Sequence, residues 1–447
     1  MRVFRGAAVM AAALSVGAAA APKGPVEEYV REAMPPGFQV ATTEVDGALY
    51  TDAAGHVLYI WPQKSEFAGQ VGEQAGKPTC DNTKQQKTTG FPTPYPGGVE
   101  LPNVATRPTC AESWPPVYAA DDAKPVGKWS IVMRTYGKKQ WAYGGYALYT
   151  SALDTQAGFA AASGKLRAKG ASGATREPVG PSADVPAQFA VTSTRTGRLL
   201  SLIGGPSVYT YDKDQANKSN CDAVCEQSWE PVLAANTAPV NRGDWSIFER
   251  SPGIKQWAFR KKPLYTRVGE ERPHSFDGGD IPGWHNVYTQ PAPAPPKGFT
   301  VQDTPRGQVL ADAKGRTLYL YNCVEDSFDQ GVCDHPKTTQ VYRWAVCGGG
   351  DPAACVENFP YVVADRNARS DSQIWSIVWI DPKTGKFAAD NQAGALRVWA
   401  YRERPIYTFI RDKKAGDAIA DSWGEGNGWR NGYHAIWVRD QYSSYNE

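Results

Sequence analysis

Eight cysteines are the side chains of this chain that could do chemistry most directly, because a thiolate can bind a metal or form a disulfide. There are five histidines, and among them only His335 lies close to a cysteine pair. The chain lacks zinc-type ligand spacing and a Cys-x-x-Cys-His sequence, which excludes covalent haem attachment. The even number of cysteines favours disulfides. The predicted pairs are Cys80–Cys110, Cys221–Cys225, Cys323–Cys333 and Cys347–Cys355.

Histidines and carboxylates are the other groups with which the chain could do chemistry. His285 and His434 hold matching positions on predicted strands, which favours imidazoles held by a backbone partner. The acidic loops before them lack the EF-hand spacing, so we interpret them as solvated turns. The chain has no Gly-x-Ser-x-Gly elbow, P-loop, dinucleotide-binding fingerprint or zinc-protease motif. The sequence therefore predicts no catalytic centre, no metal site and no cofactor.

The elements that must position these side chains recur three times along the chain. Each copy opens on Phe-x-Val after a proline, and continues with a glycine-bounded hairpin and a cysteine four residues before an aromatic residue. A twelve-residue stretch follows, as KQWAYGGYALYT from Lys139, KQWAFRKKPLYT from Lys255 and RVWAYRERPIYT from Arg397. Because aromatics that recur in every copy indicate core packing, we expect Trp141, Trp257 and Trp399 to be mostly buried. The charged residues from Arg260 and Arg402 are expected on exposed strands.

A last anchor, Gly-aromatic-His followed by three largely apolar residues, occurs only in the second and third copies, from Gly283 and Gly432. The alternating apolar and polar residues, rich in Tyr, Trp, Val and Thr, predict an all-β fold of three tandem antiparallel β-rich repeat domains. Each copy has an early and a late strand that ends on tyrosine, which indicates an internal duplication. The alternative architecture is a propeller-like closed ring of six half-units.

The predicted boundaries follow composition. They are a signal peptide 1–20, an N-terminal segment 21–34 with a short helix over 26–34, a repeat domain 35–160, a flexible linker 161–184, a repeat domain 185–290, a proline-rich linker 291–296 and a repeat domain 297–441. Pro25 and the two glutamates that follow it favour the helix. Because few contacts should cross the linkers, we expect each copy to fold on its own core.

One motif of the second copy resembles a known family. Tyr209-Thr-Tyr211-Asp-Lys-Asp214 matches the Tyr-x-aromatic-x-x-Asp motif of a bacterial secreted-repeat family of predicted lipoproteins of unknown function. Trp229 and Pro231 after the cysteines, and Tyr265 in Pro-Leu-Tyr, are similar to further elements of that family. The outer copies keep the aromatics but have Lys64 and Val324 at the acidic position. The resemblance implies export and a repeat fold, and it supplies no activity.

The N-terminus predicts export. Arg2 and Arg5 precede an alanine-rich apolar run over 7–20, which is typical of a signal peptide. Removing these twenty residues lowers the formal charge from +2 to 0, so the chain has no excess of basic residues that would favour nucleic acid binding. No later apolar run is long enough for a transmembrane anchor. We therefore expect a periplasmic or secreted, non-catalytic repeat protein that acts as a binding or scaffolding module for an envelope glycan, peptide or protein. The alternative is a hydrolase acting on an envelope polymer through carboxylates in the clefts between copies.

Overall fold

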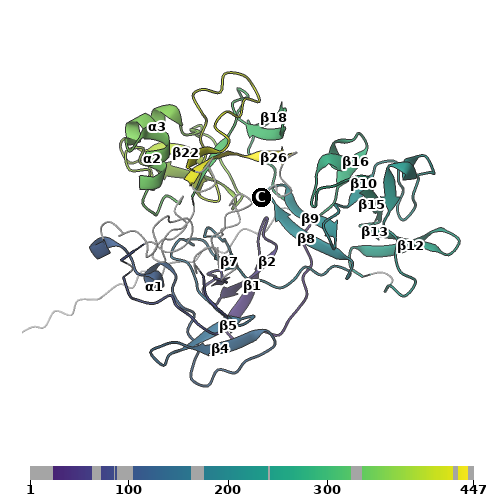
Figure 1. Cartoon of the computed structure of the whole chain (residues 1–447), viewed down its shortest axis with the longest axis horizontal. Helices are drawn as coiled ribbons and strands as arrows, with labels where there is room; N and C mark the ends of the chain where they lie inside the picture. The colour runs from purple at the N-terminus through teal and green to yellow at the C-terminus, as the bar shows by residue number, and fades with distance from the viewer. Residues whose placement is uncertain are drawn as a thin grey trace, which may run out of the picture.

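The computed structural model describes residues 24–62, 72–84, 86–87, 104–162, 176–239, 242–323, 335–425 and 431–440. Within these residues the strands form nine small antiparallel sheets of two to four strands. The predicted all-β class is confirmed. None of the described sheets closes into a barrel or a propeller, so the alternative of a closed ring was wrong. Figure 1 shows three lobes, with copy 1 below, copy 2 on the right and copy 3 at the upper left.

The elements of copy 1 are β1 (Phe38–Thr42), β2 (Ala48–Asp52), β3 (Tyr59–Ile60), η1 (Val104–Thr106), α1 (Cys110–Ser113), β4 (Trp129–Met133), β5 (Lys139–Tyr143), β6 (Tyr146–Ala147) and β7 (Glu177–Pro178). Those of copy 2 are β8 (Phe189–Thr194), β9 (Gly197–Leu202), β10 (Tyr209–Tyr211), η3 (Cys225–Gln227), β11 (Trp229–Pro231), β12 (Trp245–Ser251), β13 (Ile254–Phe259), β14 (Lys262–Pro263), β15 (Tyr265–Arg267), η4 (Asp277–Asp280), β16 (Trp284–Asn286) and β17 (Tyr288–Pro291). Those of copy 3 are β18 (Thr300–Thr304), β19 (Gly307–Ala311), β20 (Tyr319–Cys323), α2 (Val341–Gly348), α3 (Pro352–Asn358), β21 (Trp375–Ile380), β22 (Leu396–Tyr401), β23 (Arg404–Pro405), β24 (Trp423–Glu425), β25 (Asn431–Ala435) and β26 (Trp437–Asp440).

The entry sheet of each copy is closed by the last strand of that copy. In copy 2 the Leu200 N–H donates to the Val287 carbonyl at 2.9 Å, and the Val287 N–H donates to the Val208 carbonyl at 3.0 Å. Copies 1 and 3 repeat both bonds. The corresponding residues are Tyr50, Val179 and Leu58 in copy 1 and Leu310, Ile436 and Leu318 in copy 3. Strand pairing between residues 79 to 129 positions apart therefore fixes where each copy ends.

This pairing corrects one predicted boundary and one predicted helix. Residues 176–184 were assigned to the flexible linker, but β7 pairs with β3 and occupies the place of β16 and β25. The helix predicted over 26–34 was also wrong. That segment is extended, because Tyr29 bridges Ala183 and the Val30 N–H donates to the Ser182 carbonyl at 2.9 Å. Backbone pairing with the end of copy 1 outweighs the local helix signal.

The twelve-residue stretch of each copy forms a hairpin with a two-residue turn. The turn residues are Gly144–Gly145, Arg260–Lys261 and Arg402–Glu403, and all six have positive φ. Two positive φ values match a type I′ turn, whose twist suits a hairpin. The charged residues of these stretches were expected on exposed strands. Lys262 is exposed on β14, but Arg402 and Glu403 are buried, and the two charged pairs form turns and not strands. Their backbones adopt a conformation that is strained for residues with a Cβ atom.

The aromatic anchors form the cores of the copies. Trp141, Trp257 and Trp399 are only 7, 3 and 7% exposed, which confirms the predicted burial. In copy 2 the Phe189 ring lies 4.5 Å from the ring of Trp245 and 5.8 Å from that of Trp257. Edge and tilted contacts of this kind stabilise aromatic clusters beyond the area that they bury.

The three copies also dock on one another through buried ion pairs. Arg402 of copy 3 makes two hydrogen bonds to Asp46 of copy 1, at 2.8 and 3.0 Å, and both side chains are at most 5% exposed. Arg198 of copy 2 donates to Glu27 of the N-terminal segment at 2.8 Å. Copies 2 and 3 meet where Arg195 donates to the Ala435 carbonyl at 3.2 Å. These contacts cross the boundaries where few were expected.

Candidate functional site

Each copy contains a three-layer sandwich of planar side chains. In copy 2 Trp284 stacks on Trp229 at 3.7 Å on one side and on Tyr211 at 4.4 Å on the other. The middle layer comes from β16, the strand before the last one of the copy, so the sandwich fastens that strand to the cysteine-containing segment. Of the family-motif residues, Tyr211 and Trp229 are thus packing elements, and Pro231 ends β11 opposite Tyr265.

Copies 1 and 3 keep the sandwich with other side chains. In copy 3 the stacked layers are Tyr433 and Phe359, 3.7 Å apart, with Tyr321 tilted at 5.3 Å. In copy 1 the middle layer is Arg176, whose guanidinium carbon lies 4.0 Å and 4.4 Å from the ring centroids of two tryptophans, Trp61 and Trp114. An arginine between two indole faces combines stacking with cation–π attraction. The same three-layer arrangement therefore has a tryptophan, a tyrosine or an arginine as its middle layer.

The acidic residue of the family motif binds a tyrosine of the other half of its copy. The Tyr265 hydroxyl donates to Asp214 at 2.9 Å, and the Tyr209 hydroxyl donates to Glu270 at 2.6 Å. Asp214 follows Tyr209 by five residues, and Glu270 follows Tyr265 by five. Each half-unit thus supplies one tyrosine and one acid, and the two halves exchange hydrogen bonds across the β10–β15 pair. Sequence reasoning singled out Asp214 and missed Glu270, although its spacing could have revealed it.

The same exchange recurs in the outer copies. Tyr59 donates to Asp154 at 2.8 Å and Tyr319 donates to Asp412 at 2.7 Å. In both cases the acid lies five residues after the late tyrosine. Lys64 and Val324 fall outside the described residues, and in copy 1 Glu73 accepts the late tyrosine's hydrogen bond at 2.7 Å instead.

Backbone groups occupy the other oxygens of these acids. Asp214 accepts from the Asn220 N–H at 2.7 Å, Asp154 from the Ala162 N–H at 3.1 Å and Asp412 from the Ile419 N–H at 3.1 Å. Burial raises the pKa of Asp214 and Asp412, and the bonds they accept oppose that shift. Such a carboxylate closes a loop of six to eight residues and has its oxygens engaged, so these acids are structural.

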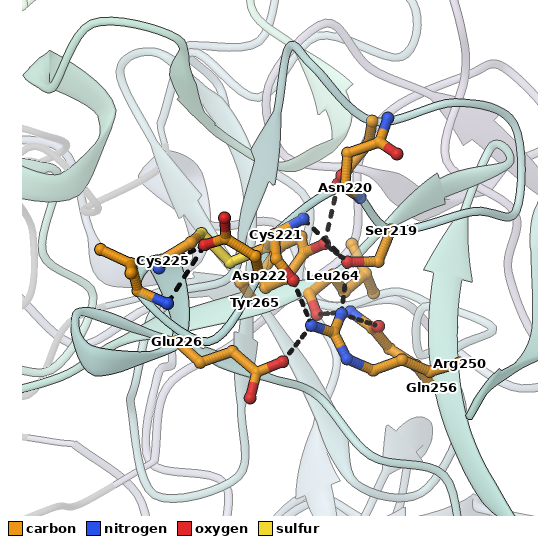
Figure 2. A network of polar contacts seen from close by, with 12 residues as sticks. Ser219, Asn220, Cys221, Asp222, Cys225, Glu226, Arg250, Gln256, Leu264 and Tyr265 are labelled. Atoms are coloured by element: carbon orange, nitrogen blue, oxygen red, sulfur yellow. Dashed lines mark hydrogen bonds and ion pairs between the residues drawn. A yellow bond between two sulfur atoms is a disulfide. The ribbon is translucent and has the colours of Figure 1, made fainter. Parts of the chain in front are cut away.

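Figure 2 shows the polar network around the Cys221–Cys225 disulfide. Arg250 lies at its centre and binds Ser219, the Cys221 carbonyl, Glu226 and Gln256. A hydrogen bond of 2.7 Å between Ser219 and the Tyr265 hydroxyl connects this network to the tyrosine–acid pair. The Tyr265 pKa is raised to about 12, chiefly by burial, so this phenol stays a donor at neutral pH.

Copy 1 has the same network at equivalent positions. Arg134 binds Gln140 and the Cys80 carbonyl. Gln140 then donates to the Leu148 carbonyl at 2.7 Å, as Gln256 donates to Leu264 at 2.9 Å. A network that recurs around two disulfides, with every named donor paired, fastens the cysteine segment to the hairpin.

The disulfide predictions stand as follows. The structure confirms three pairs, Cys80–Cys110, Cys221–Cys225 and Cys347–Cys355. The fourth pair, Cys323–Cys333, cannot be placed because Cys333 lies outside the described residues and nothing is described of the Cys323 side chain. Among the described residues no group of three His, Cys, Asp or Glu side chains could hold a metal ion.

One polar site of copy 1 lies at positions where the described parts of the other copies carry apolar residues. A hollow of about 250 Å³ lies between the N-terminal segment and the entry sheet of copy 1. It is lined by Tyr29, Val30, Arg31, Glu32, Met34, Val40, Tyr50 and Pro181. Sequence reasoning missed this site, because its carboxylate stands in a segment that seemed to precede the first copy.

Glu32 is the hydrogen-bonding centre of the hollow. It accepts a bond of 2.8 Å from Lys128, and the Tyr50 and Tyr143 hydroxyls approach its second oxygen at 3.4 and 3.3 Å. The bond to Glu32 raises the Lys128 pKa, so the ammonium and the carboxylate neutralise each other. Burial raises the Tyr50 pKa, followed by its contact with Tyr143, which keeps the phenol protonated.

The copies differ at these positions. Leu200 and Leu310 take the place of Tyr50, as their identical strand bonds show. Counted back from the Phe-x-Val anchor, Ala183 and Pro293 stand where copy 1 has Glu32. The shared fold thus requires none of these polar groups. A buried phenol in place of leucine needs a polar partner, and Glu32 supplies it at distances that leave lone pairs available.

Comparisons with protein-family models, with curated proteins and with solved structures found no match for this chain. In the part of the chain that the structure describes, no helix has the length and apolar character needed to cross a membrane.

Proposed function

We propose that this chain is an exported, non-catalytic binding protein of the cell envelope, built as a scaffold of three docked copies, and that it belongs to the secreted-repeat family that it resembles. The observation that carries the proposal is the contrast between shared and unshared polar groups. Shared tyrosines, acids and arginines serve the fold of each copy. Glu32 and Tyr50, whose equivalent positions in copies 2 and 3 carry apolar residues, line a hollow.

Export is supported by the N-terminal arginines, the apolar run and the three disulfides. Disulfides persist in oxidising compartments such as the periplasm and the cell exterior. The buried Asp46–Arg402 and Glu27–Arg198 pairs support a scaffold, because each fixes one copy against another part of the chain. A rigid arrangement holds a binding site without the ordering cost that a flexible chain would pay.

The lining of the hollow favours a small neutral ligand segment with both C–H and O–H surfaces, such as one sugar unit of an envelope glycan. Its lining combines apolar side chains, among them Met34, Val40 and Pro181, with the polar groups of Glu32 and Tyr50. Lys128 already neutralises Glu32, which removes the attraction for a cationic ligand, while the Arg31 guanidinium of the lining lies over the Tyr29 ring. The volume lies below the roughly 300–1,000 Å³ of sites for drug-sized molecules, which suits one or two units.

Titration calorimetry of the mature protein tests this proposal with two probes, a soluble N-acetylhexosamine trisaccharide and a neutral tripeptide. We expect saccharide binding that Val40→Phe abolishes by filling the hollow and that Glu32→Gln weakens at least tenfold. Glu28→Gln is the matched control, because Glu28 is an exposed acid on the same segment. Unaltered binding in Val40→Phe would place the ligand elsewhere. Release of new reducing ends from the saccharide would overturn the non-catalytic role and favour the hydrolase.

A further inference from the structure

Most of the lining of the hollow comes from the N-terminal segment. Residues 24–34 of that segment form a strap, which supplies five of the eight lining residues. These are Tyr29, Val30, Arg31, Glu32 and Met34. The entry sheet of copy 1 supplies Val40 and Tyr50, and Pro181 completes the lining. The hollow therefore exists only while the strap lies across copy 1.

Copy 1 holds the strap through contacts that lie mostly near the surface. Two backbone hydrogen bonds, of 2.9 Å from the Val30 N–H and 2.8 Å to the Glu28 carbonyl, join the strap to residues 182–184. Met34 packs at the edge of an apolar cluster of copy 1. The ion pair of Glu32 has partly exposed side chains, and a pair of this kind contributes little to stability. These contacts alone hold the strap weakly.

Copy 2 holds the other end of the strap in a buried polar cluster. Glu27 is 4% exposed, and its carboxylate accepts bonds of 2.8 Å from Arg198 and 2.5 Å from the Thr289 hydroxyl. The Glu27 N–H donates to the side chain of Gln290 at 3.1 Å. A buried carboxylate that is paired in this way is a strong anchor, because an unpaired buried charge is costly. The firm attachment of the strap is therefore to copy 2, whereas the lining residues belong to the strap and to copy 1.

The same part of copy 2 also positions the opposite wall of the hollow. The Gln290 side chain donates to the carbonyls of Thr43 and Glu44, at 2.6 and 2.9 Å. These two residues belong to the turn between β1 and β2, the strands that carry Val40 and Tyr50 into the lining. One region of copy 2 thus fixes both the strap and the entry turn of copy 1.

Gly47, in this entry turn, shows how closely the three parts meet. It has a φ of +74°, and an added Cβ atom would lie 2.8 Å from the Glu27 Oε1 atom and 3.1 Å from the guanidinium carbon of Arg198. Glycine is required where two other parts of the chain approach the backbone this closely. The strap, the entry turn and copy 2 are therefore in direct contact beside the hollow.

The anchor for Glu27 differs from its counterpart in copy 3. The closing strand of copy 3 pairs with its entry sheet in the same register as that of copy 2. Other side chains stand at the three equivalent positions. They are Gln308, Val438 and Arg439. The shared fold thus does not require an arginine, a threonine and a glutamine at these positions, and in copy 2 they serve to bind the strap.

We propose that Glu27 is a positioning residue, whose attachment to copy 2 holds the strap across copy 1 and so keeps the hollow formed. In the seated state Glu32 lies beside Tyr50. In the released state Glu27 leaves Arg198, the strap leaves copy 1 and the hollow opens to solvent. The binding of a ligand in the hollow rests on the proposed function, whereas the dependence of the hollow on copy 2 does not.

Thermodynamic linkage gives this arrangement a second consequence. A ligand that binds the formed hollow binds only the seated strap, so it favours the attachment of Glu27 to copy 2 by the same factor. A ligand in copy 1 thus tightens the docking of copy 2, although copy 2 supplies none of the lining residues named above. This coupling separates a positioning role from a merely structural one.

Hydrogen exchange followed by mass spectrometry tests the positioning role on the full mature chain without ligand. Glu27→Ala should raise the exchange of residues 28–34 at least about tenfold, because it removes the buried carboxylate that anchors the strap. The exchange of β4 and β5 in copy 1, and of β12 and β13 in copy 2, should stay unchanged. Glu28→Ala is the matched control, since Glu28 is the exposed acid next to Glu27.

Two results would overturn the proposal. If residues 28–34 stay protected in Glu27→Ala, copy 1 alone holds the strap. If β4 and β5 lose protection together with the strap, Glu27 supports the fold of copy 1 and not the position of the strap. Should Glu27→Ala fail to fold, Thr289→Val decides, because it removes one bond to Glu27 and must raise the same exchange while the same strands stay protected.

Titration calorimetry with the N-acetylhexosamine trisaccharide extends the test to binding. We expect Glu27→Ala to weaken binding at least about tenfold and Glu28→Ala to leave it unchanged. Saturating trisaccharide should also slow the exchange of residues 28–34 in the unaltered chain. Equal affinities of Glu27→Ala and the unaltered chain would overturn the positioning role even though the proposed function holds. A trisaccharide that does not bind the unaltered chain, while Glu27→Ala releases the strap, would refute the proposed ligand and support the positioning role.

Discussion

Copies 2 and 3 use the same strained turn for opposite purposes. In copy 2 Arg260 turns back onto its own copy and binds Asp244 at 2.6 Å, with both side chains partly exposed. In copy 3 the equivalent Arg402 is buried and binds Asp46 of copy 1. The equivalent turn of copy 1, Gly144–Gly145, has no side chain to contribute. The same turn geometry thus supports an ion pair within copy 2, an ion pair between copies 3 and 1, and no side-chain contact in copy 1.

The cores show the same difference. The two apolar clusters of copy 2 contain residues of copy 2 alone, among them Trp245, Trp257 and Tyr265. By contrast, one cluster joins Val45 and Phe159 of copy 1 to the entry sheet and tryptophans of copy 3. A repeat can therefore be an independent unit or half of a larger one, although the sequence anchors are the same. The following experiments separate these two cases.

The largest expected effect is on isolated fragments. A fragment over 185–291 should fold cooperatively with its disulfide intact, because its two apolar clusters are complete. It loses only polar contacts near its surface, such as those of Arg198 and Gln290 with the N-terminal part of the chain and those of Arg195 with copy 3. A fragment over 297–441 should lose cooperative unfolding, because removal of copy 1 exposes the shared cluster and leaves Arg402 without its partner. Circular dichroism during thermal unfolding distinguishes the outcomes. Two equally cooperative fragments would contradict the shared core.

Breaking the ion pair between copies should have the next largest effect. Arg402→Ala leaves Asp46 buried and uncompensated, and removing one partner of such a pair costs about 3–5 kcal/mol. Arg260→Ala at the equivalent turn is the control, and its exposed pair should cost about 0–1 kcal/mol. Urea unfolding measures the loss in the free energy of unfolding for both variants. Equal losses would mean that the pairs do not differ in burial as the structure indicates.

Sequence reasoning predicted the parts of the fold that local patterns encode. The strand class, three of the disulfides and the burial of Trp141, Trp257 and Trp399 follow from alternation and recurrence. It failed at Arg176, because the last anchor was sought as an aromatic residue. An arginine between two tryptophans fills the same layer, so that pattern left the closing strand of copy 1 unrecognised.

Charged residues misled the sequence analysis for a related reason. Arg402 and Glu403 appear to be surface residues, since charged side chains are seldom buried without partners. Asp46, the partner of Arg402, lies 356 positions away, and Thr155, a partner of Glu403, lies 248 positions away, which are separations that no periodicity reveals. Glu32 escaped notice likewise, because its partners Tyr50, Tyr143 and Lys128 are brought together only by the docking of the N-terminal segment.

The tyrosine–acid pair offers a smaller test within copy 2. Tyr265→Phe removes the hydroxyl that binds Asp214 and Ser219, and a buried acceptor left without its donor costs about 1–3 kcal/mol. The cost should be larger at pH 7 than at pH 4, because the bond is stronger when Asp214 is ionised. Tyr211→Phe is the control, since only its ring packs in the sandwich, and it should cost under about 0.5 kcal/mol. Urea unfolding of the 185–291 fragment at both pH values gives the comparison.

The smallest effects should differ in sign between the two turns. Lys261 is exposed at a φ of +65°, and Lys261→Gly relieves a strain of roughly 1–2 kcal/mol while adding about 0.5–1 kcal/mol of unfolded-state entropy. We therefore expect a net gain of about 0.5 kcal/mol. Glu403→Gly relieves the same strain but removes the contacts with His335 and Thr155, so it should destabilise the chain. Thermal unfolding of the two variants at pH 6 measures both changes in stability. A gain in both would show that Glu403 is as dispensable as Lys261, and the turn of copy 3 would then contribute to docking through Arg402 alone.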